Sequence, residues 1–198
     1  MTQTSNDWQQ MVAGEPYNGL AADIRQQKQR IRDLTAQFNR APGKGNLKKL
    51  LQSFKQVGEQ CRIEAGIHVD LGAQLVLGNR VYINAHCVLL DAAELRIDDD
   101  VLLGPAVQIY TVSHSRDAQL RRQGIQQASP VHIKAQAWIG GGAIILPGVT
   151  VGREAIVGAG SVVTRNVPDF ACVKGNIPLC FPKISMNLWV HLQFLKNK

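Results

Sequence analysis

Five histidines are the side chains of this 198-residue chain best suited to proton transfer near neutral pH: His68, His86, His114, His132 and His191. An imidazole with an ordinary pKa of about 6.5 can take a proton from a hydroxyl group while that group attacks an electrophile. Only His114 lies in an aperiodic stretch, the polar segment 111–130. His114 is therefore a candidate general base, although a solvated loop histidine is the simpler interpretation of its position alone.

An aliphatic residue recurs at every sixth position through much of the chain. The first run is Leu71, Leu77, Ile83 and Leu89, then, after a phase slip, Ile97, Leu103 and Ile109; the second is Ile133, Ile139, Ile145, Val151, Val157 and Val163. Because a six-residue period fits neither a helix nor a simple strand, each unit must hold a short strand and a corner. The next residue is often small or polar, as at Gly72, Gly78 and Asn84, and we expect these residues to turn corners with positive φ. The prediction is a mainly β protein, a solenoid with three sides per turn.

Three segments follow from this pattern. Residues 1–60 carry apolar side chains at helical spacing and are predicted to form two or three helices that cap the first coil. Residues 61–168 are the solenoid, and 111–130 is an extruded loop within it. In the tail, 169–198, residues 184–195 have helical spacing. We expect this C-terminal helix to dock on the solenoid or a neighbouring subunit, and attachment to a membrane surface is the less favoured alternative.

Composition limits the partners and the compartment. The formal net charge is +7, but the basic residues are dispersed among acidic ones and no nucleic-acid motif is present, so no nucleic-acid partner is predicted. The four cysteines lack CxxC spacing, which favours reduced thiols over disulfides or a metal cage. The polar first twenty residues and the lack of an 18-residue apolar stretch predict a cytoplasmic protein with no membrane partner.

Several strings identify a family resemblance. They are Ala13-Gly14-Glu15-Pro16-Tyr17, Tyr82-Ile83-Asn84, Thr111-Val112-Ser113-His114, Trp138-Ile139-Gly140-Gly141-Gly142, Leu146-Pro147-Gly148-Val149-Thr150 and Gly158-Ala159-Gly160-Ser161-Val162-Val163-Thr164. Over residues 11–178 the chain resembles the hexapeptide-repeat acetyltransferases of the maltose/galactoside O-acetyltransferase type. The resemblance implies a left-handed parallel β-helix, a homotrimer, acetyl-CoA as the donor, a sugar-like hydroxyl compound as the acceptor, and no required metal. It also implies that His114 is the general base, because His114 stands where the family keeps that residue.

The resemblance also implies roles on the donor side. Asn84 would lie beside the thioester and stabilise the developing oxyanion, although a corner asparagine is the structural alternative. The other residues that match donor-binding positions are Trp138, Gly141, Gly142, Ala159, Gly160, Thr164, Arg165 and Lys183. Small residues would let the pantetheine arm approach the backbone, Trp138 would form an apolar wall unless it is a core residue, and the basic residues would meet the nucleotide.

On the acceptor side, Asp70, Tyr82 and, more weakly, Asp91 match sugar-contacting positions. The chain departs from the family in two places nearby. Many relatives carry a Glu about a dozen residues after the histidine, which orients the imidazole, where this chain reads Gly124-Ile125-Gln126-Gln127-Ala128. Gly19 stands where galactoside-type relatives place an acceptor-binding Asp. A glutamine carbonyl could accept the ring N–H but brings no full charge to an imidazolium.

Two other functions are open. One is a zinc enzyme of the γ-type carbonic anhydrase kind, which would need three histidines at the metal. His68 and His86 are eighteen residues apart and could stack on successive coils, but with His132 they do not form a credible ligand set. The other alternative is a non-catalytic solenoid that serves as a scaffold or interaction surface.

Overall fold

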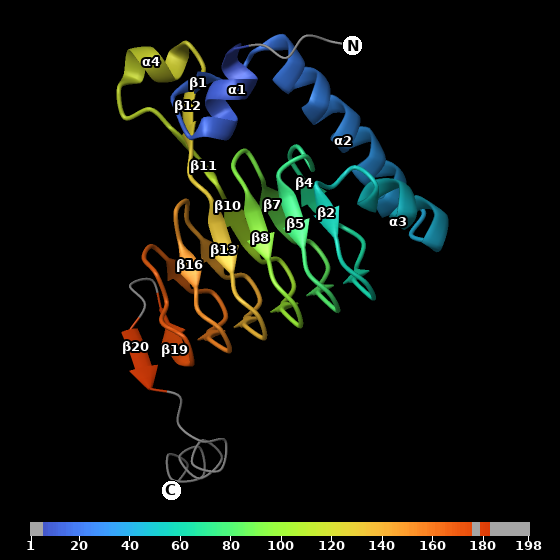
Figure 1. The fold of residues 1–198 in the computed structure, drawn as a ribbon, viewed down its shortest axis with the longest axis vertical. Helices are drawn as coiled ribbons and strands as arrows, with labels where there is room; N and C mark the ends of the chain where they lie inside the picture. Colours follow the sequence, from blue (N-terminus) through green and yellow to red (C-terminus); the bar gives the residue numbers. More distant parts are fainter. Residues whose placement is uncertain (1–5, 176–178, 183–198) are drawn as a thin grey trace, which may run out of the picture.

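The computed structural model describes residues 6–175 and 179–182 and confirms a solenoid of stacked, mainly parallel strands. Three helices lie near the N-terminus: α1 (Asn6–Ala13), α2 (Ala22–Arg40) and α3 (Lys44–Leu51), with the short strand β1 (Tyr17–Asn18) after α1. Figure 1 shows α2 and α3 at the N-terminal end of the strand stack. Their buried Ile31, Phe38 and Leu50 belong to the same hydrophobic cluster as Ile63 and Ile67 of the first coil. The helices thereby cover apolar side chains that the end of a solenoid would otherwise expose.

The solenoid has three faces, each named here after its first strand. The β2 face holds β2 (Gln56–Val57), β5 (Leu75–Leu77), β8 (Leu95–Ile97), β13 (Val131–Ile133) and β16 (Thr150–Val151). The β3 face holds β3 (Arg62–Ile63), β6 (Tyr82–Ile83), β9 (Leu102–Leu103), β14 (Trp138–Ile139), β17 (Ile156–Val157), β19 (Ala171–Lys174) and β20 (Leu179–Pro182). The β4 face holds β4 (His68–Val69), β7 (Val88–Leu90), β10 (Gln108–Tyr110), β15 (Ile144–Ile145) and β18 (Val162–Val163). The chain visits the three faces in turn. The first strand of the solenoid begins at Gln56, inside the segment 1–60 that the spacing of apolar residues assigned to helices.

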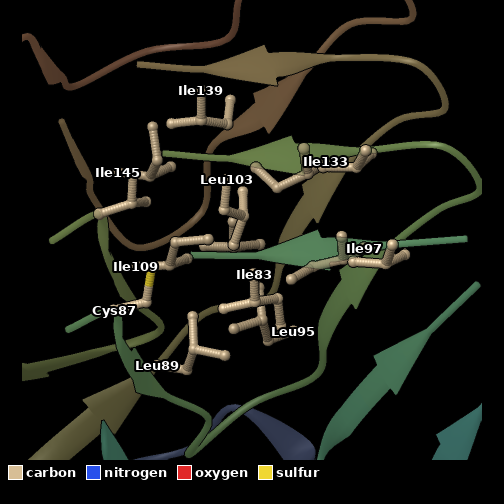
Figure 2. Close-up of a cluster of buried hydrophobic side chains, with 14 of the residues drawn as sticks. Ile83, Cys87, Leu89, Leu95, Ile97, Leu103, Ile109, Ile133, Ile139 and Ile145 are labelled. Atoms are coloured by element: carbon tan, nitrogen blue, oxygen red, sulfur yellow. The ribbon is translucent and has the colours of Figure 1, made fainter. Parts of the chain in front are cut away.

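The six-residue period marks the inward positions. Figure 2 shows Ile83, Leu103 and Ile139 with their neighbours pointing into the interior from successive coils. Equivalent residues are in register, as Ile83 pairs with Leu103 and Leu103 with Ile139, and all three are at most 1% exposed. Apolar side chains therefore stack in columns along the axis. Cys87 lies in the same interior, where burial raises the pKa of its thiol to about 11 and keeps it protonated.

The corners differ from the expectation drawn from the small residues. Among the residues that directly follow the periodic aliphatics, Gly72 has positive φ, whereas Gly78 and Asn84 do not. In these two corners the left-handed residue lies two positions later, at Arg80 and His86. The glycines are needed instead for close approach between coils: a Cβ on Gly152 would lie 2.3 Å from the backbone nitrogen of Asp169.

The segment 111–130, called the arm from here on, is an ordered hairpin and not an irregular loop. It contains β11 (Val112–His114), α4 (Ala118–Arg122) and β12 (Ile125–Ala128), and it lies beside α1 in Figure 1. The carboxylate of Asp117 caps α4 by accepting the backbone N–H groups of Gln119 and Leu120. β12 pairs with β11 on one side and with β1 on the other, so the arm and the N-terminal segment form one small antiparallel sheet.

Two predictions lie outside the described residues: the C-terminal helix over 184–195 and the role of Lys183. Within the described part of the chain, no helix is both long and apolar enough to span a bilayer.

Candidate active site

His114 ends β11 and lies in a row of three side chains across the small sheet. Tyr17 is in register with Gln126, and Gln126 is in register with His114. Directly opposed residues of antiparallel strands project from the same face of a sheet, so the three side chains share one face. The hydroxyl of Tyr17 donates to Oε1 of Gln126 at 3.1 Å, and His114 is exposed. The imidazole is thus presented at the surface by a hairpin with an ordered support.

The arm is braced immediately after the histidine. The guanidinium of Arg121 donates to the backbone carbonyls of Ser115 and Arg116, at 2.8 and 3.2 Å. At the base of the arm, the backbone N–H of Ser129 donates to the carbonyl of Thr111 at 2.7 Å. The bonds from Arg121 hold the part of the arm that follows His114, and the bond between Ser129 and Thr111 closes the base of the arm. Together they limit the positions that His114 can reach.

Asp70 lies at the corner between the β4 and β2 faces, the same corner from which the arm emerges. Its carboxylate pairs with Nζ of Lys28 on α2 at 2.9 Å, and its side chain is 15% exposed. Burial, and then the negative charge of Asp70, raises the pKa of Tyr17 well above its usual range. The phenol therefore remains a hydrogen-bond donor at any physiological pH. Tyr17, Asp70 and the arm form one polar corner.

Asp91 occupies the next coil at this corner, but its position differs from that of a sugar-contacting residue. It has no exposed surface, and its two oxygens accept the backbone N–H groups of Leu71 at 2.8 Å and Gln74 at 3.2 Å. Burial raises the pKa of this carboxyl to about 7, while the backbone donors oppose the rise. The structure gives Asp91 a role in holding the corner of the preceding coil, because peptide N–H groups need partners once they are buried.

A second group of predicted residues lies on the β3 face and at its corner with the β4 face. Tyr82 and Trp138 both pair in register with Leu102, and Trp138 and Leu102 are 53% and 48% exposed, so Trp138 is a surface residue and not a core one. Asn84 follows Tyr82 by two positions. Its Oδ1 accepts the backbone N–H of Ala85 at 2.8 Å, which leaves the amide NH2 as the donor of that side chain.

The small residues at this second corner form an open rim. Gly142 and Gly160 have φ values of 67°, and no atom would lie within 4 Å of a Cβ on either. Gly141 is tighter, since its Cβ would be 3.1 Å from the carbonyl oxygen of Pro105, and Ala159 is exposed. An extended ligand could therefore approach the backbone at Gly142 and Gly160 without meeting side chains.

The predicted site residues therefore fall into two groups at opposite edges of the β4 face. His114 and Asp70 lie at the arm corner, as do Thr164 and Arg165, which follow β18 and are exposed. The other group comprises Tyr82, Asn84, Trp138, Gly141, Gly142, Ala159 and Gly160. Each side of a coil holds about six residues, which at about 3.3 Å per residue separates the two groups by roughly 15–20 Å within one chain.

Sequence patterns missed two residues of the arm corner, Tyr17 and Lys28. Tyr17 was visible only as part of a family string, and its hydroxyl reaches a residue 109 positions away. Lys28 resembles any other basic residue on the polar side of a helix. No local signal marks a pairing that depends on tertiary structure.

Metal ligation finds no support among the described residues, where no group of three or more His, Cys, Asp or Glu side chains could hold an ion. His132 instead pairs with Asp98 at 2.7 Å on the β2 face, and His86 packs at the corner beside Gly66. The three histidines of the carbonic anhydrase alternative lie on different parts of the solenoid.

Comparison with sequence families agrees with the fold. Residues 130–165 match the family described as bacterial transferase hexapeptide (six repeats). Residues 10–57 match the maltose acetyltransferase hexapeptide capping motif, which covers α2, α3 and the first strand of the solenoid. Nodulation protein L of Rhizobium meliloti is 41% identical over 179 residues, which is 89% of this chain and 97% of that protein.

Two solved structures extend the comparison to three dimensions. A maltose O-acetyltransferase from Clostridium difficile has a TM-score of 0.87 and 36% identity, and the match covers 92% of this chain and all of that one. A hexapeptide-repeat acetyltransferase from Vibrio cholerae, complexed with acetyl coenzyme A, has a TM-score of 0.82 and 30% identity, with 89% and 97% of the two chains covered.

Proposed function

The chain belongs to the hexapeptide-repeat acetyltransferases of the maltose and galactoside O-acetyltransferase type, and on this basis we propose that it transfers the acetyl group of acetyl-CoA to a hydroxyl group of a sugar or sugar-like acceptor. The observation that carries the proposal is the exposed imidazole of His114 on a braced arm, in a family whose relatives are acetyltransferases. A cytoplasmic location remains a prediction from the sequence.

His114 acts as the general base. Its unprotonated ring nitrogen takes the proton of the acceptor hydroxyl as the oxygen bonds to the acetyl carbon, the carbon–sulfur bond breaks, and the imidazolium returns the proton to the CoA thiolate. The products are the acetyl ester and CoA thiol, so no other reactant is needed. Such assistance is worth about 10² to 10⁴ in rate.

Asn84 stabilises the negative charge that develops on the carbonyl oxygen. Because its Oδ1 is held by the N–H of Ala85, the amide NH2 is oriented away from its own backbone and can donate to an oxyanion. Removal of one such donor costs about 10² to 10³ in turnover. The open rim at Gly142 and Gly160 would admit the pantetheine arm, with Gly141, Ala159 and Trp138 beside it, and Thr164, Arg165 and Lys183 would meet the nucleotide.

The site needs two copies of the chain. Reacting groups must approach to about 3–3.5 Å, whereas His114 and Asn84 lie at opposite edges of the β4 face of one chain. A neighbouring copy can bring its Asn84 and Tyr82 to the arm corner that carries His114, Asp70 and Thr164. Cyclic association of a three-sided prism repeats this junction three times, which supports the proposal of a homotrimer.

The exposed apolar residues of the β3 face support the same assembly. Leu102 and Trp138 are neighbours in register, and each is about half exposed. A Leu102→Glu variant is expected to sediment as a monomer and to lose most turnover. Gln56→Glu is the control, because it introduces the same side chain at an exposed position of the β2 face, and it should leave the assembly intact. A trimeric, active Leu102→Glu variant would contradict the proposed interface.

Release of CoA thiol from acetyl-CoA across a panel of sugars tests the function directly. We expect turnover with at least one sugar and a loss of about 10² to 10⁴ in His114→Ala, with acetyl-CoA binding retained. His132→Ala is the matched control, since it breaks only a surface pair with Asp98. Saturable acetyl-CoA binding without acetylation of any acceptor would favour the scaffold alternative.

A further inference from the structure

We propose that Tyr17 is a positioning residue for His114 and that it acts through Gln126, an inference that rests on the proposed base role of His114. The hydroxyl of Tyr17 fixes the carboxamide of Gln126, whose oxygen then accepts one ring N–H of His114. The opposite ring nitrogen is thereby kept unprotonated for the acceptor hydroxyl. The contact between the N-terminal segment and the arm is part of the active-site support.

The three side chains form a continuous row. Tyr17, Gln126 and His114 occupy the same register position on β1, β12 and β11, so they project from one face of the small sheet. Oε1 of Gln126 has two lone pairs, and the Tyr17 hydroxyl, at 3.1 Å, occupies one of them. The second lone pair is the acceptor available to the neighbouring imidazole.

Tyr17 is a fixed donor. Its side chain is only 2% exposed, and burial, followed by the charge of Asp70, raises its pKa. The strand that carries it is anchored on both sides: the backbone N–H of Asn18 donates to Oδ1 of Asp7 at 2.7 Å, and that of Gly19 donates to the carbonyl of Gly124 at 3.0 Å. A donor held in this way permits one orientation of the carboxamide, with the oxygen toward Tyr17.

Gly19 provides the space for the carboxamide. A Cβ at this position would lie 2.5 Å from Oε1 and 2.7 Å from Cδ of Gln126. The φ of Gly19 is outside the left-handed region, so its backbone does not require glycine. The missing side chain therefore matters because Gln126 occupies that volume. Gly19→Ala should displace Gln126 without removing the hydroxyl of Tyr17 or the ring of His114.

The first test is a double-mutant cycle on turnover in the full chain. Tyr17→Phe keeps the buried ring, and we expect kcat to fall about three- to tenfold with KM for acetyl-CoA unchanged. In a Gln126→Ala background the same substitution should change kcat by less than about twofold, because the path is already broken. Gly19→Ala should resemble Gln126→Ala. Equal losses from Tyr17→Phe in both backgrounds would overturn the proposal.

Tyr110→Phe is the matched control for the loss of a tyrosine–glutamine bond. The hydroxyl of Tyr110 donates to Oε1 of Gln108, two residues away on β10 and outside the small sheet. We expect kcat in this variant to remain within about twofold of the wild type. A loss equal to that of Tyr17→Phe would show that the effect is not specific to the row and would count against the proposal.

A readout independent of turnover is the tautomer of His114, measured by ¹⁵N NMR of histidine-labelled protein. The resonances missing from His114→Ala identify the residue. We expect one neutral tautomer in the wild type and a mixture in Tyr17→Phe and Gln126→Ala. Gln126→Glu, which keeps an oxygen acceptor and adds charge, should move the acid limb of the pH–rate profile upward by about one pH unit. Unchanged tautomer populations in both loss variants would contradict the proposal.

The outcome also separates this inference from the function on which it rests. If His114→Ala abolishes turnover while Tyr17→Phe and Gly19→Ala retain it, the general base stands and the positioning row is wrong. If His114→Ala retains turnover, the proposed function itself is wrong.

Discussion

The coils and the arm use β-structure in opposite ways. In the coils, short parallel strands stack in register, and an inward side chain such as Ile139 packs on equivalent residues above and below. In the arm, antiparallel strands leave the stack and present polar side chains such as His114 at the surface. β8 and β13 still pair directly, Leu95 with Val131, across the excursion. A solenoid corner can therefore accept a functional insertion without a change in the register of the coils.

The largest expected effect comes from removing the arm. The ends of the arm are already joined by the bond between the N–H of Ser129 and the carbonyl of Thr111, so a two-glycine link in place of residues 113–127 should close without strain. We expect turnover to fall by at least about 10² to 10⁴ because the base is lost. Circular dichroism should retain the β signal. Loss of the solenoid signal would contradict the independence of the two regions.

Core truncation should show the opposite pattern. Ile139→Ala opens a cavity among fully buried residues and is expected to lower the free energy of unfolding by about 2–5 kcal/mol. Turnover per folded molecule should remain near that of the wild type. Denaturant titration measures the change, and Leu120→Ala on the arm, where the side chain is 42% exposed, should stay within about 0.5 kcal/mol.

The next prediction tests whether position 152 requires glycine because two coils approach closely there or because of its backbone conformation. Gly152→Ala places a Cβ 2.3 Å from the backbone nitrogen of Asp169 and should destabilise the protein by about 1–3 kcal/mol, since a packed coil must shift. Gly45→Ala is the control, because no atom lies within 4 Å of its Cβ and the residue is in α3. It should leave stability unchanged or raise it by up to about 1 kcal/mol. Equal effects of the two changes would refute the packing explanation.

The last effect concerns pH. Burial raises the pKa of Asp91 from its ordinary 3.8 to about 7, so between these values the folded chain binds a proton that the unfolded chain has released. Its contribution to stability is therefore greatest below about pH 4 and is lost as the pH rises through about 7. Between pH 5 and pH 8 the free energy of unfolding, measured by urea titration, should fall more in the wild type than in Asp91→Asn. An identical fall in the two proteins would refute the link to this carboxyl.

Much of the coil structure was predictable because its signal is local and repeated. One inward aliphatic in six residues specifies the columns of Ile83, Leu103 and Ile139. The reason for the glycines was not predictable in the same way. The sequence shows that a glycine often follows a periodic aliphatic residue, as Gly152 follows Val151. Only the stacked coils show that the backbone nitrogen of Asp169 lies where a Cβ on Gly152 would be.

The arm was predictable only in part. Loss of the period marked its limits, and the histidine within it suggested chemistry. Its pairing with β1 depends on residues more than a hundred positions apart, so neither the small sheet nor the bond from Tyr17 to Gln126 has a local signature. For Asp91 the sequence suggested a side chain in contact with sugar, whereas the structure buries this carboxylate among backbone N–H donors.

Subunit complementation tests the central claim, a site shared between the arm of one copy and the rim of its neighbour. His114→Ala and Asn84→Ala are each expected to have little activity alone. When the two are unfolded and reassembled together at equal amounts, about a quarter of the junctions in a cyclic trimer combine an intact His114 with an intact Asn84. The account predicts recovery of about that fraction of wild-type turnover. Mixed assemblies no more active than the separate variants would contradict it.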